Sequence, residues 1–236
     1  METVAERHPE QTLMLCASGG GRVDLGSLRW FHEVWLSDNT DPLDRVPMQW
    51  AASHFLPANV VGAHVTREGD RPVAFGCAVA MSARFGFDID FDAMTADEVA
   101  VCRLAVALYR DIRPLVQQGE LWRLVPPGER AALAYAAADA RRAVVFGFQL
   151  TAPSDHADVP AEPLRPGGLD PDQVYEVTAV DLAADAGRGG AASRGGAAGR
   201  GGAGVDRRRG SALMDEGLEW PLAEPCTARI WVLESA

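Results

Sequence analysis

The chain has 236 residues, of which 47% are apolar, so it can bury one substantial core or two small ones. Its formal net charge is -11, and all of its basic side chains other than histidine are arginine. A negative surface repels phosphate backbones, which excludes nucleic acid as an expected partner. The absence of lysine excludes a lysine Schiff base within these residues.

The cysteine spacing and the N-terminal segment indicate where in the cell the protein is expected. The cysteines lack CxxC spacing, which argues against zinc sites and disulfide scaffolds; they are Cys16, Cys77, Cys102 and Cys226. The N-terminal segment lacks a basic stretch followed by an apolar one, and no apolar run reaches the roughly 20 residues that span a bilayer. The sequence therefore predicts a cytoplasmic protein without a membrane span, a metal site or a cofactor.

The first half of the chain alternates short apolar runs with helical patterns, which is typical of an α/β fold built on parallel strands. Residues 2–11 fit either the end of a helix or a disordered tail. Two later helices have explicit start signals: Asp41 before Pro42, and the capping box from Thr95 to Glu98. Strands are predicted at 12–15, 34–36, 60–65 and 84–87, and helices at 43–55, 75–83 and 95–119.

After Gly119 the pattern changes to successive strands, so we place a domain boundary there and expect domains at 1–119 and 120–236. Strands are predicted at 121–124, 130–138, 142–150, 174–178 and 227–233, with a further closing element at 211–217. Residues 187–204 are almost wholly Gly, Ala, Arg and Ser and cannot bury enough apolar surface to order themselves. We therefore expect a disordered insert near 187–210.

The residues that indicate chemistry lie between Cys16 and Asp41. Three consecutive glycines, Gly19 to Gly21, leave bare backbone that a ligand can approach. Asp38 and Asp41 follow Trp35, and a carboxylic acid beside an indole suits acid chemistry on a sugar. From these residues alone, the alternative that both aspartates cap a helix stays open.

Four motifs carry a resemblance to a known family. Cys-Ala-Ser-Gly-Gly-Gly-Arg-Val-Asp from Cys16, the spacing on to Trp-Leu-Ser-Asp-Asn-Thr-Asp, Gly-Ala-His-Val at 62–65 and Ala-Arg-Phe-Gly at 83–86 resemble the C-terminal half of the α-galactosidases of glycoside hydrolase family 36. The resemblance runs in order from about Leu13 to the strand ending at Leu233. It implies the last part of a (β/α)₈ TIM barrel followed by an antiparallel β-sandwich, in a family that often forms homo-oligomers.

The resemblance also implies an activity and a site. The activity is retaining hydrolysis of terminal α-D-galactosyl residues from galacto-oligosaccharides, with Asp38 as the general acid/base and Asp41 left to cap its helix. The residues expected to contact the sugar are Cys16, Ala17, Ser18, Gly19 and Asp38. Met14 departs from the family pattern, because members often carry a glutamate at that position, two residues before the cysteine.

The catalytic nucleophile of the family lies in an earlier Lys-x-Asp-x-Asn-like segment, which a chain without lysine does not contain. We therefore expect this chain to be a fragment of an α-galactosidase and to be inactive alone. The alternative is a non-catalytic sugar-binding or structural remnant of the family. Trp35 and His64 each fit either a sugar contact or a structural role, and for His64 the structural role is favoured.

Overall fold

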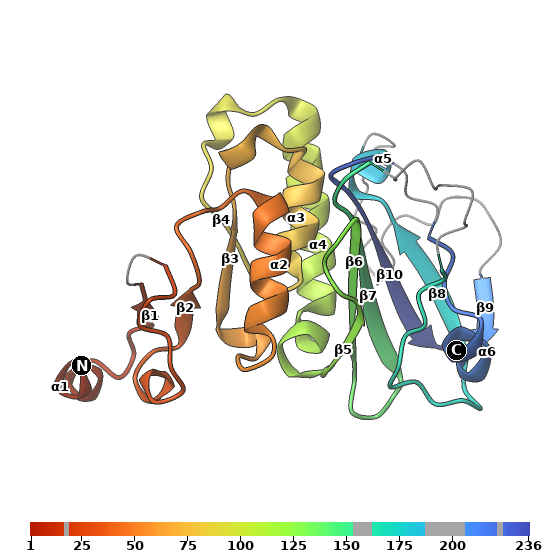
Figure 1. Cartoon of the computed structure of the whole chain (residues 1–236), viewed down its shortest axis with the longest axis horizontal. Coiled ribbons are helices and arrows are strands. Elements are labelled where there is room, and N and C mark those ends of the chain that lie inside the picture. The colour runs from red at the N-terminus through yellow and green to blue at the C-terminus, as the bar shows by residue number, and fades with distance from the viewer. Residues whose placement is uncertain (17–18, 153–161, 187–205, 221–223) are drawn as a thin grey trace.

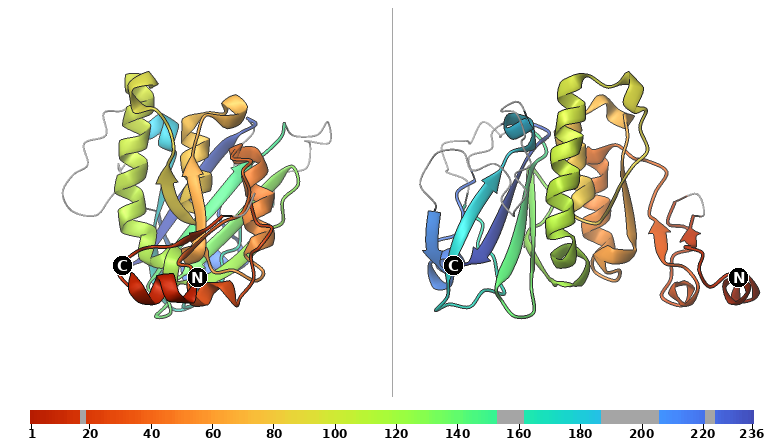
Figure 2. Two further views of the ribbon diagram at one scale, coloured as in Figure 1. Left: turned by 90° about the vertical axis from the view of Figure 1, so that its left-hand side faces the viewer. Right: turned by 180° about the vertical axis from the view of Figure 1, so that it is seen from behind.

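The structure is a computed structural model of the whole chain, and it describes residues 1–16, 19–152, 162–186, 206–220 and 224–236. Figure 1 shows three layers: a parallel sheet, a group of helices beside it, and an antiparallel sheet on the far side of those helices. The view from behind in Figure 2 shows the long helix α4 standing between the two sheets. The N-terminal helix α1 (Glu2–Arg7) lies at the end of the molecule beyond the parallel sheet.

The parallel sheet has four strands in the order β1-β2-β3-β4. They are β1 (Met14–Leu15), β2 (Glu33–Trp35), β3 (Val61–Val65) and β4 (Arg84–Phe87), with 3₁₀ turns at Ser27–Arg29, Ala58–Val60, Glu68–Asp70 and Phe91–Ala93. The connecting helices are α2 (Pro42–Ala52) and α3 (Val73–Met81), and α4 (Ala96–Gln118) follows the last strand. The predicted parallel strands and helices are thus confirmed, with ends that differ by a few residues.

The helix starts form as the local sequence requires. The Asp41 side chain accepts a hydrogen bond from the Leu43 amide, 2.9 Å away, and Pro42 occupies the first helical position. At α4 the Thr95 hydroxyl accepts from the Glu98 amide while the Glu98 carboxylate accepts from the Thr95 amide. Both predicted caps are confirmed. None of the helices that the structure describes combines the length and apolarity needed to cross a bilayer.

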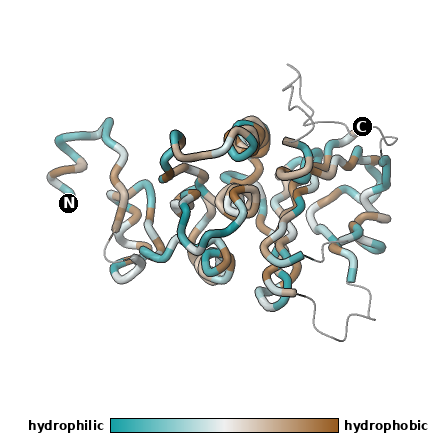
Figure 3. Tube along the Cα trace, turned by 90° about the horizontal axis from the view of Figure 1, so that it is seen from above, coloured by the Kyte–Doolittle hydropathy of each residue, from teal (hydrophilic) through white to brown (hydrophobic). Residues whose placement is uncertain are grey.

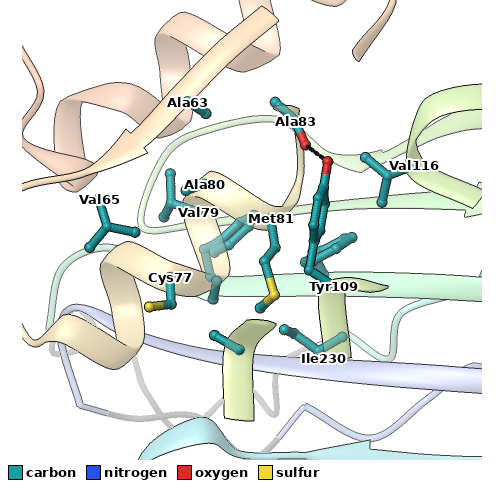
Figure 4. Close-up of a cluster of buried hydrophobic side chains, with 14 of the residues drawn as sticks. Ala63, Val65, Cys77, Val79, Ala80, Met81, Ala83, Tyr109, Val116 and Ile230 are labelled. Atoms are coloured by element: carbon teal, nitrogen blue, oxygen red, sulfur yellow. Dashed lines mark hydrogen bonds between the residues drawn. The ribbon is translucent and has the colours of Figure 1, made fainter. Parts of the chain in front are cut away.

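Helix α3 is apolar all round because it lies between the two sheets, where every side of a helix is covered. Figure 4 shows Met81 of α3 near Ile230 of the antiparallel sheet, with the Tyr109 hydroxyl of α4 donating to the Ala83 carbonyl. At the C-terminal end of α3, Tyr135 of the same antiparallel sheet donates to the Ser82 carbonyl at 2.8 Å. Apolar stretches gather where helices and sheets meet (Figure 3), so one continuous core joins the two halves of the chain.

The antiparallel sheet has six strands in the order β5-β6-β7-β10-β8-β9. They are β5 (Glu120–Val125), β6 (Arg130–Ala136), β7 (Arg142–Gln149), β8 (Val174–Val180), β9 (Asp206–Arg209) and β10 (Thr227–Ser235), with short helices α5 (Leu182–Ala186) and α6 (Gly210–Asp215). One face covers α3 and α4. The other face buries Trp220 and Trp231 against a bridge between Leu164 and Leu218.

One expectation about the second half stays a prediction and another needs correction. The described residues form one antiparallel sheet with α3 and α4 on one face and α6 with loop residues on the other, so the β-sandwich stays a prediction. Residues 206–210 were expected to be disordered, but Asp206–Arg209 pairs with β8 and Gly210 begins α6. Arg207 forms an ion pair with Glu176, its Nε 3.0 Å from the carboxylate, which anchors this polar strand. Residues 187–205 of the predicted insert lie outside the described residues.

The capping box of α4 predicts a pH dependence. A hydrogen bond from Arg67 and then one from the Thr95 backbone lower the pKa of Glu98 from its ordinary value of 4.5 to about 2. A carboxyl with a depressed folded-state pKa stabilises the fold above its unfolded pKa, and this contribution is lost as pH falls through the folded pKa. We expect Glu98→Gln to lower the free energy of unfolding, measured with urea, most at pH 5 and above, and less as pH falls from 4.5 toward 2. A difference between the two proteins that stays constant over this range would contradict the assignment.

Candidate active site

The glycine turn after β1 packs directly on the backbone that carries Asp38. Gly19 has a φ of +76°, and a Cβ added to it would lie 2.7 Å from the Ser37 Cα and 3.4 Å from the Asp38 amide nitrogen. A Cβ on Gly20 would lie 2.9 Å from the Leu36 carbonyl oxygen. Side chains at these two positions would therefore push the β1 and β2 loops apart.

Of the predicted site residues that the structure describes, Gly19 lies against the backbone of Asp38, and Cys16 follows the end of the neighbouring strand. Gly19 is buried against the β2 loop, Cys16 is an exposed free thiol at the end of β1, and Asp38 is exposed beyond the end of β2. Ala17 and Ser18 lie outside the described residues. Because β1 and β2 are parallel neighbours, their carboxyl ends place the glycine turn and Asp38 at the same edge of the sheet.

The polar neighbours of Asp38 are all engaged, whereas Asp38 is not. The Ser37 hydroxyl accepts from the Asn39 amide at 3.1 Å, and the Asn39 side chain donates to Asp44 at 2.7 Å. The Asn39 side-chain oxygen accepts from the Asp41 amide at 3.0 Å. Within the described part of the chain, the Asp38 carboxylate makes no hydrogen bond or ion pair. It is therefore a carboxylate on a fixed loop, available to a ligand.

The loop after β3 holds the loop after β2. Glu68 accepts hydrogen bonds from the Thr40 amide and hydroxyl, and the Thr40 hydroxyl lies 2.9 Å from that of Thr66. The bond from Thr40 lowers the pKa of Glu68. Arg71 donates hydrogen bonds from Nε and Nη2 to the Asp41 carboxylate at 3.0 to 3.2 Å, and this contact raises the pKa of Arg71. Sequence reasoning did not identify Glu68 or Arg71, because neither lies near Asp38 in the chain.

The buried side chain of Arg45 also binds the loop after β2. Arg45 on α2 is only 3% exposed and donates to the Gly62 carbonyl at 2.6 Å and to the Ser37 carbonyl at 3.4 Å. Its guanidinium lies over the Trp35 ring, 5.1 Å from the centroid, and burial lowers its pKa to about 10. Arg45 falls within the buried stripe of α2 with Val46, which was a detectable signal in the sequence.

The face of the parallel sheet that the helices leave uncovered is polar. Glu33 on β2 pairs with Arg84 on β4, Nε to Oε2 at 3.3 Å, and its Oε1 lies 4.0 Å from the His64 Nε2 on β3. His64 in turn packs on Trp35 with ring centroids 4.8 Å apart. The structure therefore gives His64 and Trp35 packing partners within the sheet. No group of three or more acidic, histidine or cysteine side chains suited to a metal ion occurs among the residues described.

The close approach at Gly19 leads to a stability prediction. An alanine at a left-handed position costs about 1–2 kcal/mol in backbone strain, and here it also meets backbone atoms of Ser37. We expect Gly19→Ala to lower the free energy of unfolding by about 1–3 kcal/mol and to speed amide exchange at residues 36–38. Gly128→Ala is the matched control, because an added Cβ there has no heavy atom within 4 Å. Equal effects of the two substitutions would show that the two loops do not touch.

Comparison with known proteins supplies a family. Residues 1–119 match the family profile described as Melibiase, and residues 130–233 match the glycosyl hydrolase family 36 C-terminal domain. The chain is 36% identical over 190 residues to alpha-galactosidase AgaA of Geobacillus stearothermophilus, an alignment that covers 77% of this chain and 26% of AgaA. The chain thus spans about a quarter of the length of that relative.

Solved structures agree with this match along the whole chain. Variants of AgaA in complex with raffinose and with stachyose each superpose with a TM-score of 0.83, at 29% and 30% identity. Each match covers 100% of this chain and 30% of the AgaA chain. The two adjoining profile matches and the structural similarity give the same answer: the chain belongs to glycoside hydrolase family 36.

Proposed function

We propose that this chain is a portion of a retaining α-galactosidase that removes terminal α-D-galactosyl residues from galacto-oligosaccharides, with Asp38 as general acid/base. The observation that carries the proposal is the unpaired, exposed carboxylate of Asp38 on a loop whose other polar side chains are engaged. Family relatives bound to raffinose and stachyose support the substrate class.

The division of labour between the two aspartates follows from their contacts. Asp41 is occupied by its cap and by Arg71, so it cannot exchange a proton without releasing both partners. Asp38 can donate a proton to the departing glycosidic oxygen and then remove one from the incoming water. Cys16, Ala17, Ser18 and Gly19 would border the galactosyl unit, because the glycine turn lies against the Asp38 backbone.

A retaining mechanism needs a second carboxylate about 5–5.5 Å from the first. By the family resemblance this nucleophile belongs to an earlier segment with a lysine, and the chain has no lysine. We propose that residues 1–119 are the last part of a (β/α)₈ barrel and residues 120–236 its C-terminal domain. Each edge strand of the parallel sheet, β1 and β4, has one strand neighbour among the described residues. A groove of about 410 Å³ containing Phe87 and Phe91 lies beside β4, which suits further packing there.

The alternative function is a non-catalytic sugar-binding or structural remnant of the family. The specific observation in its favour is Met14, which is 46% exposed where family members often carry a glutamate beneath the sugar-binding loop. The two proposals differ in whether Asp38 matters once the missing segment is supplied.

The first prediction concerns the chain alone. We expect no turnover of an aryl α-galactoside above the background rate, because a proton donor without its nucleophile retains only residual catalysis. The measurement is release of the aryl alcohol at enzyme concentrations high enough to detect slow turnover. Robust hydrolysis by the chain alone would show that the nucleophile lies within these residues.

The second prediction uses a chimera in which this chain replaces the matching segment of AgaA. We expect Asp38→Asn in the chimera to lower kcat/KM for raffinose by about 10²–10⁴-fold, which is the usual contribution of general acid–base catalysis. For an aryl galactoside whose leaving group needs no proton, Asp38→Asn should lower the rate of the first step, transfer of galactose to the enzyme, much less. Asp172→Asn, at an exposed turn of the C-terminal half, is the control. If Asp38→Asn behaves like Asp172→Asn, the remnant function is the better account.

A further inference from the structure

We infer that Arg71 is a positioning residue for Asp38, acting through Asp41 and the loop that joins β2 to α2. The inference rests on the proposed acid/base role of Asp38 and adds to it the group that fixes where this acid stands. Arg71 lies on the loop between β3 and α3, thirty-three positions after Asp38 in the chain.

The Asp41 carboxylate joins two structural elements. Its Oδ1 accepts from the Leu43 amide and so begins α2, while Arg71 Nη2 binds Oδ2 at 3.0 Å and Arg71 Nε reaches both oxygens at 3.2 Å. Its side chain is 13% exposed, against 34% for that of Arg71. A forked arginine contact of this kind fixes direction as well as distance.

The loop after β3 is shaped around this carboxylate. Gly69 has a φ of +74°, and a Cβ there would lie 2.1 Å from the Asp41 Oδ2. Only glycine leaves room for the carboxylate at that position. Glu68, next to it, accepts both hydrogen bonds from Thr40. Two consecutive residues of the β2 loop, Thr40 and Asp41, are therefore held by side chains from one neighbouring loop.

These contacts leave Asp38 little backbone freedom. Before Asp38 in the chain, Arg45 donates to the Ser37 carbonyl. After it, Thr40 and Asp41 are bound by side chains of the loop between β3 and α3. The freedom that remains is rotation of the Asp38 side chain. A displacement of about 1 Å in a catalytic group can cost about 10²-fold in rate, so contacts that hold this loop in place matter for a proton donor.

Arg71 also connects the site to the C-terminal half. The Cys226 thiol, at the start of β10, is 8% exposed and sits at a φ of +52°. Burial raises the pKa of this thiol, and the positive charge of Arg71 acts in the opposite direction. The guanidinium that binds Asp41 therefore also acts electrostatically on the residue just before β10.

The first test measures amide hydrogen exchange in the full 236-residue chain. We expect Arg71→Ala to speed exchange at Thr40 and Leu43 by more than tenfold, and Arg71→Lys, which keeps the charge but loses the fork, to have a smaller effect. Arg67→Ala is the matched control, since Arg67 lies on the same loop but pairs with Glu98 at 2.6 Å. It should speed exchange at the start of α4 and leave Thr40 unchanged. Equal exchange at Thr40 in both alanine variants would overturn the inference.

The second test separates positioning from general stability. In the AgaA chimera we expect Arg71→Ala to lower kcat/KM for raffinose by about 10–100-fold, with a loss below about threefold for an activated aryl galactoside. Added methylguanidinium should restore part of the raffinose rate in Arg71→Ala and none in Arg71→Ala/Asp41→Ala.

The outcomes distinguish this inference from the function on which it rests. If Asp38→Asn hydrolyses raffinose normally, the acid/base role is wrong. If Asp38→Asn shows the leaving-group dependence but Arg71→Ala loses both substrates equally, Arg71 only stabilises the fold, and the inference is wrong while the function stands.

Discussion

The pairing of the Asp41 carboxylate with Arg71 is the interaction on which the candidate site depends. One oxygen begins helix α2 and the other binds a guanidinium from the next loop, so the carboxylate fixes the β2 loop to two elements at once. Asp38 lies three positions earlier on the same loop, and its carboxylate has no hydrogen-bond or ion-pair partner among the described residues. Two aspartates three positions apart thus differ in their contacts: Asp41 is engaged by two elements, and Asp38 is exposed.

Features encoded by neighbouring residues could be predicted from the sequence. The caps at Asp41 and Thr95 use groups within three positions of each other, and both form as expected. The four parallel strands could likewise be predicted, because each is a short run of apolar residues that are neighbours in the chain. The approach of Gly19 to Asp38 could also be anticipated, because successive parallel strands bring their carboxyl ends to one edge.

Features that depend on distant residues could not be predicted. Glu68 and Arg71 contact residues 28 and 30 positions away, and nothing in the local pattern pairs them with Thr40 and Asp41. Strand β9 is polar and rich in arginine, so its apolar content gave no strand signal; its pairing with β8 and its ion pair with Glu176 supply the order. The packing of α3 and α4 on one face of the antiparallel sheet is likewise made by residues far apart in the chain.

The two faces of the parallel sheet differ in polarity and in what covers them. Val61, Ala63 and Val65 point into the core shared with the helices and are at most 3% exposed. On the opposite face, Gly62 and Gly86 lack side chains where the Glu33 carboxylate and the His64 ring lie. Ion pairs in such a position contribute little net stability, because desolvation offsets the attraction. The paired charges join β2 to β3 and β4 across the polar face, while burial of the helix-covered face is the stabilising contribution to these strands.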